Sequence, residues 1–148
     1  MPMPPDAPGP VRAVLAEFDA LPPADRVTML IEYGDDLPAL PARYADPPAS
    51  MERVTECQSP VYLAVTPSRE RPGGVDLFVS APPQAPVTRG FAGLLRELTE
   101  QLDATQVAAL PLDLPDYLGL DGAISPLRLR AMSGLLARVT RAAAALAD

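Results

Sequence analysis

The sequence predicts an α+β fold, in which a small antiparallel sheet of about three strands packs against five or so helices. Apolar residues recur at helical spacing near both ends of the 148-residue chain, and strand-like segments lie between these two regions. This order of elements is typical of helices packed on a small antiparallel sheet. The chain is long enough for one domain with its own core. We expect a single domain over residues 10–148, preceded by a disordered, proline-rich tail over residues 1–9.

Two helices are predicted ahead of the strands. The first follows Pro10, where apolar side chains of residues 11–18 fall on one helical face. The second runs over about residues 23–33 and ends at Gly34, a residue type common just after helices. Proline recurs too often over residues 35–50 for regular structure, so we expect a long ordered loop there. The core residues expected from the two helices are Val11, Val14, Leu15, Phe18, Val27, Leu30 and Ile31.

Three strands are predicted in the middle of the chain. Residues 61–66 and 75–80 are rich in β-branched and aromatic side chains, and residues 67–74 join them through the turn-forming pair Gly73-Gly74. Residues 51–55 are expected to form a third, short strand.

Helical spacing returns after the proline-rich residues 81–86. A long helix is predicted first, then a short helix capped by Asp103 and ending at Leu110. Residues 111–122 are expected to form a loop with one helical turn, and Ser125-Pro126 begins the last helix. The apolar faces are expected to comprise Phe91, Leu94, Leu95, Leu98 and Leu102 in the long helix, and Leu129, Met132, Leu136, Val139 and Leu146 in the last.

The composition excludes several classes of chemistry. Histidine and lysine are absent, so a Ser-His-Asp triad, a Cys-His pair, Schiff-base chemistry and a Walker-type phosphate loop are not available. The single cysteine cannot complete a protein-only zinc or iron–sulfur site, and we expect no bound metal or cofactor. Twelve basic and nineteen acidic residues give a net charge of −7, which argues against nucleic-acid binding.

The chain is also expected to act without a membrane. No apolar run approaches the roughly 20 residues that span a bilayer. The first ten residues lack the basic segment of a signal peptide, and one unpaired cysteine fits the reducing cytoplasm. These features predict a cytoplasmic protein.

Cys57 is the candidate reactive residue. It lies between a proline-rich stretch and the apolar strand predicted at residues 61–66, where a loop can present its thiol to a partner. A lone thiolate can perform thiol exchange, sulfur transfer or reaction with an oxidant. The neighbouring Glu56 is expected to disfavour the thiolate, and Arg53 to favour it. Alternatively, Cys57 is a small buried apolar residue without chemistry, as many free cysteines are.

Several short motifs together resemble the SufE family of sulfur-acceptor proteins. They occur in the family's order and spacing over roughly residues 10–145. The motifs are Cys57-Gln58-Ser59 before an apolar strand, Tyr33-Gly34 followed by Leu37-Pro38-Ala39-Leu40-Pro41, Thr88-Arg89-Gly90-Phe91, residues 117–120, and Ile124-Ser125-Pro126-Leu127-Arg128.

The chain departs from the family pattern at several positions around these motifs. Family members commonly carry glycine, glutamine and tryptophan where this chain has Glu56, Pro60 and Tyr62. An acidic pair common before the long helix is replaced by Pro82-Pro83-Gln84, and a glycine early in the last helix by Ala131. The thiol itself is retained.

The resemblance implies a SufE/IscU-like fold and a role in sulfur transfer. In such proteins the cysteine accepts sulfur from the persulfide of a pyridoxal-phosphate cysteine desulfurase, here a SufS-like partner, and passes it to a SufBCD-like iron–sulfur scaffold. Cys57 would be the acceptor, and the chain would activate the desulfurase rather than act as a stand-alone enzyme. The residues that the resemblance and the position of the thiol suggest for partner binding are Glu56, Gln58, Ser59, Arg89 and Arg128.

Two other classes of function stay open. A single-cysteine redox protein would want basic residues that lower the pKa of the thiol, and often a resolving cysteine, and neither is evident. A non-catalytic interaction module would use Cys57 only as a structural residue.

Overall fold

The computed structural model describes residues 4, 6–44, 50–120 and 122–147. The strands form one antiparallel sheet in the order β1-β2-β3. The elements are α1 (Gly9–Asp19), α2 (Pro23–Asp35), the 3-10 helix η1 (Ala42–Tyr44), β1 (Glu52–Arg53), β2 (Tyr62–Pro67), β3 (Val75–Ser80), α3 (Pro86–Gln101), α4 (Ala104–Ala108), α5 (Leu114–Tyr117) and α6 (Pro126–Ala147). The predicted α+β fold with a small antiparallel sheet is confirmed, with six α-helices in the described part of the chain.

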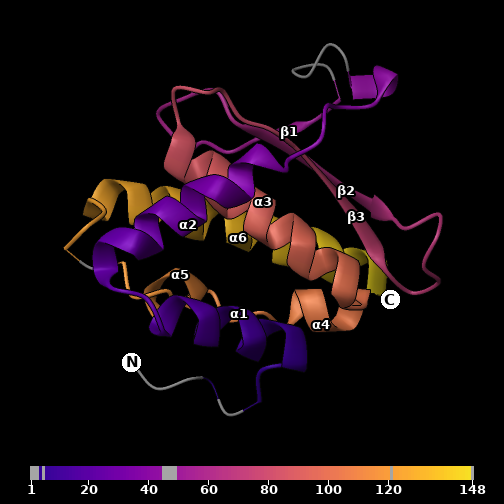
Figure 1. Cartoon of the computed structure of the whole chain (residues 1–148). Coiled ribbons are helices and arrows are strands. Elements are labelled where there is room, and N and C mark those ends of the chain that lie inside the picture. Colours follow the sequence, from indigo (N-terminus) through magenta and orange to yellow (C-terminus); the bar gives the residue numbers. More distant parts are fainter. Residues whose placement is uncertain (1–3, 5, 45–49, 121, 148) are drawn as a thin grey trace.

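The long helices α3 and α6 cover one face of the sheet, and α1, α4 and α5 lie on the far side of them (Figure 1). Strand β3 explains this arrangement, because its side chains alternate between buried and half-buried. Leu77 and Val79 belong to the core that the helices complete. On the opposite face, Phe78 packs on Tyr44 of η1, with ring centroids 5.2 Å apart.

Helices α2 and α3 approach so closely that glycine is required at their crossing. A Cβ atom at Gly90 would lie 2.1 Å from the carbonyl oxygen of Leu30, and one at Gly93 would lie 2.1 Å from that of Tyr33. Gly34 faces the backbone of Gly90 from the other helix. The prediction that Gly34 ends α2 is therefore wrong: the helix continues to Asp35, and the glycine permits packing instead.

Most of the other predicted elements are found within one or two residues of their expected bounds. Helix α1 begins at Gly9, inside the expected tail, and residues 1–3 and 5 of that tail lie outside the described residues. The third strand is shorter than expected, with only Glu52–Arg53 paired to β2. Residues 45–49 of the expected long loop also lie outside the described residues.

The predicted helix caps are present. Asp103 and Gln106 form a reciprocal capping box at the start of α4, which ends at Ala108 rather than Leu110. The hydroxyl of Ser125 accepts from the backbone N–H of Arg128 at 3.3 Å, within the first turn of α6.

Burial follows the predicted faces with few exceptions. The five apolar residues of the long helix are all buried, as are the four expected from α1. Val27 and Ile31 of α2 and Leu129 of α6 are only half-buried. The expectation for Leu146 is wrong: it is 37% exposed, and the last buried residue of α6 is Ala143. No helix in the described part of the chain is long and apolar enough to cross a membrane.

Candidate functional site

Cys57 lies on the loop between β1 and β2, and it lines one hollow together with residues around the starts of α3 and α6. The loop is closed by backbone hydrogen bonds. The N–H of Val54 donates to the carbonyl of Val61 at 2.8 Å, and the N–H of Cys57 donates to that of Val54 at 3.1 Å. The Cys57 side chain is buried, with 6% of its surface exposed. The sequence predicted that Cys57 lies on a loop ahead of the strand at residues 61–66, and the structure shows in addition that the thiol is sheltered there.

The thiol borders an open hollow of about 470 Å³, which we call the Cys57 hollow. Its walls come from the Cys57 loop, from residues 84–88 around the start of α3, and from the first turns of α6. Leu127 of α6 is 40% exposed at its rim, and Arg128 beside it is also exposed. Cys57 therefore lies beneath the surface beside a cavity and not at the centre of the core.

Arg138 of α6 ties the Cys57 loop to the helix. Its Nη2 donates to the two carboxylate oxygens of Glu56 at 2.7 and 2.8 Å, and to the hydroxyl of Thr55 at 2.8 Å. Its Nη1 donates to Glu52 Oε2 at 2.6 Å. The Arg138 side chain is only 17% exposed, and charge-assisted bonds of this length are strong. We call this group, Arg138 with Glu52, Thr55 and Glu56, the Arg138 clamp.

Two further residues of α6 support the clamp. Arg141 donates to the same Oε2 atom of Glu52 at 2.8 Å. Gly134, one turn before Arg138, leaves room for Glu56, because a Cβ atom there would lie 2.7 Å from the Cγ, Cδ and Oε1 atoms of that side chain. The helix surface is thus shaped to receive the Glu56 carboxylate.

The surroundings of Cys57 favour the neutral thiol. Burial raises the pKa of Cys57 to about 11 from its ordinary value of 9.0, and the negative charge of Glu56 adds to this rise. Arg138 and Arg53 oppose the rise. The hydrogen bond from Arg138 lowers the pKa of Glu56, so this neighbour is ionised at neutral pH. The opposite effects expected of Glu56 and Arg53 on the pKa of Cys57 are both found, and burial is a larger cause than either.

The structure gathers most of the predicted partner-binding residues. Glu56, Gln58, Ser59 and Arg128 all line the Cys57 hollow. Arg89 does not line it: its Nη1 donates to the carbonyl of Ala81 at 2.8 Å, a contact that joins α3 to the end of β3. Within the described residues, no three His, Cys, Asp or Glu side chains cluster closely enough to hold a metal ion.

Sequence reasoning missed Arg138. It lies 82 positions from Glu56 in the chain, and an arginine on a helix is ordinarily a solvated surface charge. The only local signal is the spacing of Gly134 and Arg138. It places a residue without a side chain and a cation one turn apart on one helical face.

Residues 12–143 match the profile of SufE, an Fe–S metabolism associated domain. The chain belongs to the SufE family. It is 43% identical over 141 residues to an uncharacterised SufE-like protein found in two Mycobacterium tuberculosis strains, and the match covers 95% of this chain and 96% of the relative.

A solved structure shares this fold. It is the solution structure of a hypothetical protein from Thermus thermophilus, which is 32% identical to this chain. The TM-score is 0.79, and the match covers 96% of this chain and 99% of that protein. SufE membership links the chain to iron–sulfur metabolism.

Proposed function

We propose that this SufE-family chain is a sulfur carrier that accepts persulfide sulfur on Cys57. The donor is a SufS-like cysteine desulfurase, which holds the sulfur on its own cysteine and contains the pyridoxal phosphate. The recipient is an iron–sulfur scaffold of the SufBCD-like type. The carrier needs no metal or cofactor of its own, because it only receives and releases a sulfur atom in the cytoplasm.

The transfer is a thiol exchange. Cys57 loses its proton to solvent, and its thiolate attacks the outer sulfur of the partner's Cys–S–SH group. The S–S bond of the partner breaks while a new S–S bond forms on Cys57, and the electron pair of the broken bond leaves with the partner's cysteine as a thiolate. Cys57 becomes Cys–S–SH, and no external oxidant or reductant is consumed.

The observation that carries this proposal is the position of Cys57 beside the hollow. A persulfide in contact with cellular thiols would be reduced before delivery, so a carrier requires a sheltered sulfur. It also requires access for the donor, which the Cys57 hollow offers once the loop moves. The high pKa of the thiol at rest fits a carrier that becomes reactive only when a partner displaces Glu56 or contributes positive charge.

One alternative is favoured by a specific observation. Cys57 is 94% covered and belongs to the main hydrophobic core, as it would in an interaction module with a structural cysteine. A peroxidase-like role is disfavoured, because peroxide reacts with the thiolate and the raised pKa of Cys57 keeps it protonated.

Desulfurase turnover separates the two functions. Sulfide release from cysteine would be measured for a SufS-like desulfurase alone, with the wild-type chain, and with Cys57→Ser. We expect stimulation by the wild type and none by Cys57→Ser, together with a mass gain of one sulfur atom on wild-type Cys57. Serine is nearly isosteric but does not form the attacking anion at neutral pH, so the variant tests chemistry rather than packing. Full stimulation by Cys57→Ser would instead establish an allosteric interaction module.

A further inference from the structure

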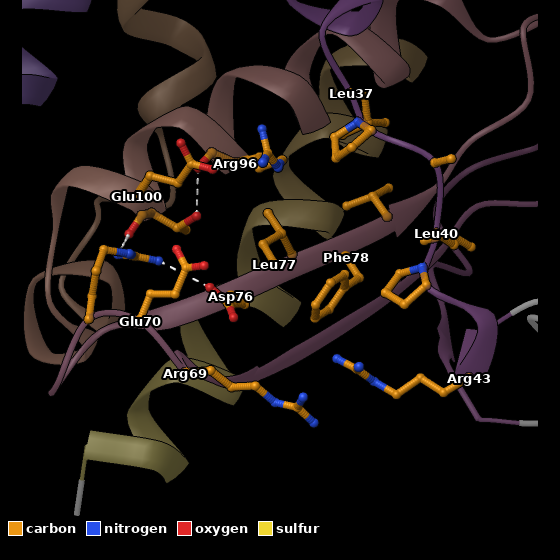
Figure 2. A pocket seen from close by; sticks show the side chains of 16 residues that line it. Leu37, Leu40, Arg43, Arg69, Glu70, Asp76, Leu77, Phe78, Arg96 and Glu100 are labelled. Atoms are coloured by element: carbon orange, nitrogen blue, oxygen red, sulfur yellow. Dashed lines mark hydrogen bonds and ion pairs between the residues drawn. The ribbon is translucent and has the colours of Figure 1, made fainter.

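A different hollow, of about 400 Å³, lies along the outer edge of β3, and we call it the β3-edge groove. It shares no lining residue with the Cys57 hollow. Figure 2 shows its lining side chains. One wall is the loop of residues 37–41 after α2, the other is residues 76–79 of β3, and Arg96 and Glu100 of α3 also line the groove.

The hydrogen-bond register shows which groups β3 presents to the groove. The Val54–Val61 bond makes these two residues a bonded pair between β1 and β2, and bonded and non-bonded pairs alternate along an antiparallel ladder. By this alternation, the residues of β3 whose backbone groups bond to β2 are Ser80, Phe78 and Asp76. The backbone N–H and C=O groups of Leu77 and Val79 therefore point away from β2.

Two arginine contacts agree with this register. The carbonyl of Val75 accepts from Arg71 Nη2 at 2.7 Å, and the carbonyl of Ala81 accepts from Arg89 Nη1 at 2.8 Å. Like the carbonyls of Leu77 and Val79, both belong to the residues that alternate with those bonded to β2. Arginine side chains therefore donate to the outward carbonyls at the two ends of this strand edge. The open part of the edge is the segment between them.

The opposite wall does not complete the sheet. Within the described residues, no backbone bond reaches the outward groups of Leu77 and Val79 from outside β3. Pro38 and Pro41 of the facing wall have no N–H to donate. An unpaired strand edge of this kind is a template for an added strand.

The charges beside the groove select the partner. Arg71 and Arg96 are paired with Asp76 and Glu100 respectively, at 3.2 and 2.7 Å. Arg43 and Arg69 make no ion pair within the described residues, and they extend on the same side of Phe78 (Figure 2).

The position of the Arg43 guanidinium is fixed by aromatic rings. It lies 5.0 Å from the ring centroids of both Tyr44 and Phe78. Glu70 also lines the groove without an ion pair among the described residues, so the lining carries four arginines and three carboxylates. In a chain of net charge −7, this small excess of positive charge, with Arg43 and Arg69 unpaired within the described residues, forms a local site for an anionic group.

We propose that the β3-edge groove binds an extended acidic segment of a partner protein. The segment adds to the sheet as a strand beside β3, and its backbone pairs with the N–H and C=O groups of Leu77 and Val79. A carboxylate of the segment contacts Arg43 and Arg69. The side chains of Pro38, Leu40 and Pro41 cover the other side of the added strand.

The test begins with random peptides displayed on phage and selected on the full chain. We expect the selected peptides to have strand-like sequences, in which β-branched residues occupy alternate positions, and to carry aspartate or glutamate. A fluorescein-labelled selected peptide should lose about tenfold or more in affinity for the Arg43→Gln, Arg69→Gln double variant. Ala39→Trp, which fills the groove from an exposed lining position, should abolish binding. Ala13→Trp, at an exposed position of α1 outside both hollows, and Cys57→Ser should bind as the wild type does.

Amide hydrogen exchange tests the strand pairing itself. Peptide binding should slow exchange at Leu77 and Val79, whereas Phe78, already bonded to β2, should change little. The proposal is overturned if no acidic peptides are selected, if Ala39→Trp binds normally, or if binding protects neither Leu77 nor Val79. Because the binding assay includes Cys57→Ser and no desulfurase, its outcome is independent of the sulfur-carrier proposal.

Discussion

At the scale of single residues, the chemistry of Cys57 is set by what surrounds it. Burial and Glu56 raise the pKa of the thiol, while Arg138 holds Glu56 beside it. Arg138 therefore has two opposite effects: its charge favours the thiolate, and its bonds keep the loop closed.

The labelling of Cys57 by a maleimide should depend steeply on pH. With a pKa of about 11, the thiolate fraction at pH 7 is about a hundredfold lower than for a thiol of pKa 9, since each unit is a factor of about ten. The labelling rate should rise with pH without levelling near pH 9, whereas that of free cysteine should level. A plateau near pH 9 would show that the loop is open at rest.

The buried thiol also links stability to pH. The folded pKa lies above the ordinary value of 9.0, so the unfolded chain loses its proton first. The stability from the neutral thiol is present below about pH 9 and is lost as pH rises toward 11. The free energy of unfolding, measured in urea from pH 7 to 11, should show this loss for the wild type. The loss due to the thiol should be absent in Cys57→Ser.

Arg138→Gln should accelerate labelling of Cys57 by about tenfold or more at pH 8, because loss of the clamp exposes the thiol and burial is the main cause of its high pKa. Stability in urea should fall by about 1–2 kcal/mol. Arg96→Gln, which removes a surface ion pair on α3, is the matched control and should change neither quantity much. Slower labelling of Arg138→Gln would mean that Arg138 acts through its charge and not as a clamp.

Gly134→Ala gives an independent test of the clamp with no change of charge. The added methyl group would lie against Glu56, so the carboxylate must move while Arg138 remains. Alanine is also the better helix former, by about 1 kcal/mol. We expect faster labelling of Cys57 without the loss of stability seen for Arg138→Gln.

At the scale of elements, three glycines fix the separation of α2 and α3. They bring two helix backbones into contact, and this crossing holds α3 where its first turn can line the Cys57 hollow. A glycine in a helix normally costs stability relative to alanine. Here the close approach outweighs that cost, because larger side chains would separate the helices.

Gly90→Ala should therefore destabilise the protein by about 3 kcal/mol, since the new methyl group meets the backbone of Leu30 rather than a movable side chain. Gly9→Ala is the control, because nothing lies within 4 Å of a Cβ atom there. Thermal and urea unfolding measure both variants. Equal stability of the two would show that α2 and α3 adjust their spacing freely.

At the scale of the whole molecule, the Cys57 hollow and the β3-edge groove have separate linings. One surrounds the end of the sheet where Cys57 lies, and the other follows the outer edge of β3. Helix α3 contributes its first turn to the former and its last turns to the latter. Under the two proposals, the sulfur donor and the acidic segment would occupy hollows with separate linings.

The two surfaces should act independently. Ala39→Trp fills the β3-edge groove without touching a residue of the Cys57 hollow, so it should stimulate a SufS-like desulfurase as well as the wild type does. Sulfide release with saturating carrier measures this. Reduced stimulation by Ala39→Trp, with Ala13→Trp normal, would show that the desulfurase itself occupies the groove.

The sequence by itself determined the class of fold, most helices and strands, and the choice of Cys57 as the candidate reactive residue. These follow from apolar periodicity, caps such as Asp103, and the absence of histidine and lysine, all of which are local or compositional. Only the tertiary structure decided the burial of Cys57, its clamp and the purpose of Gly34. Each of these depends on segments that are distant in the chain: Arg138 meets Glu56, and Gly34 meets Gly90. The sequence shows that a helix carries a glycine or a charged residue. Which group packs against the glycine or pairs with the charge is fixed only when the helices and the sheet pack together.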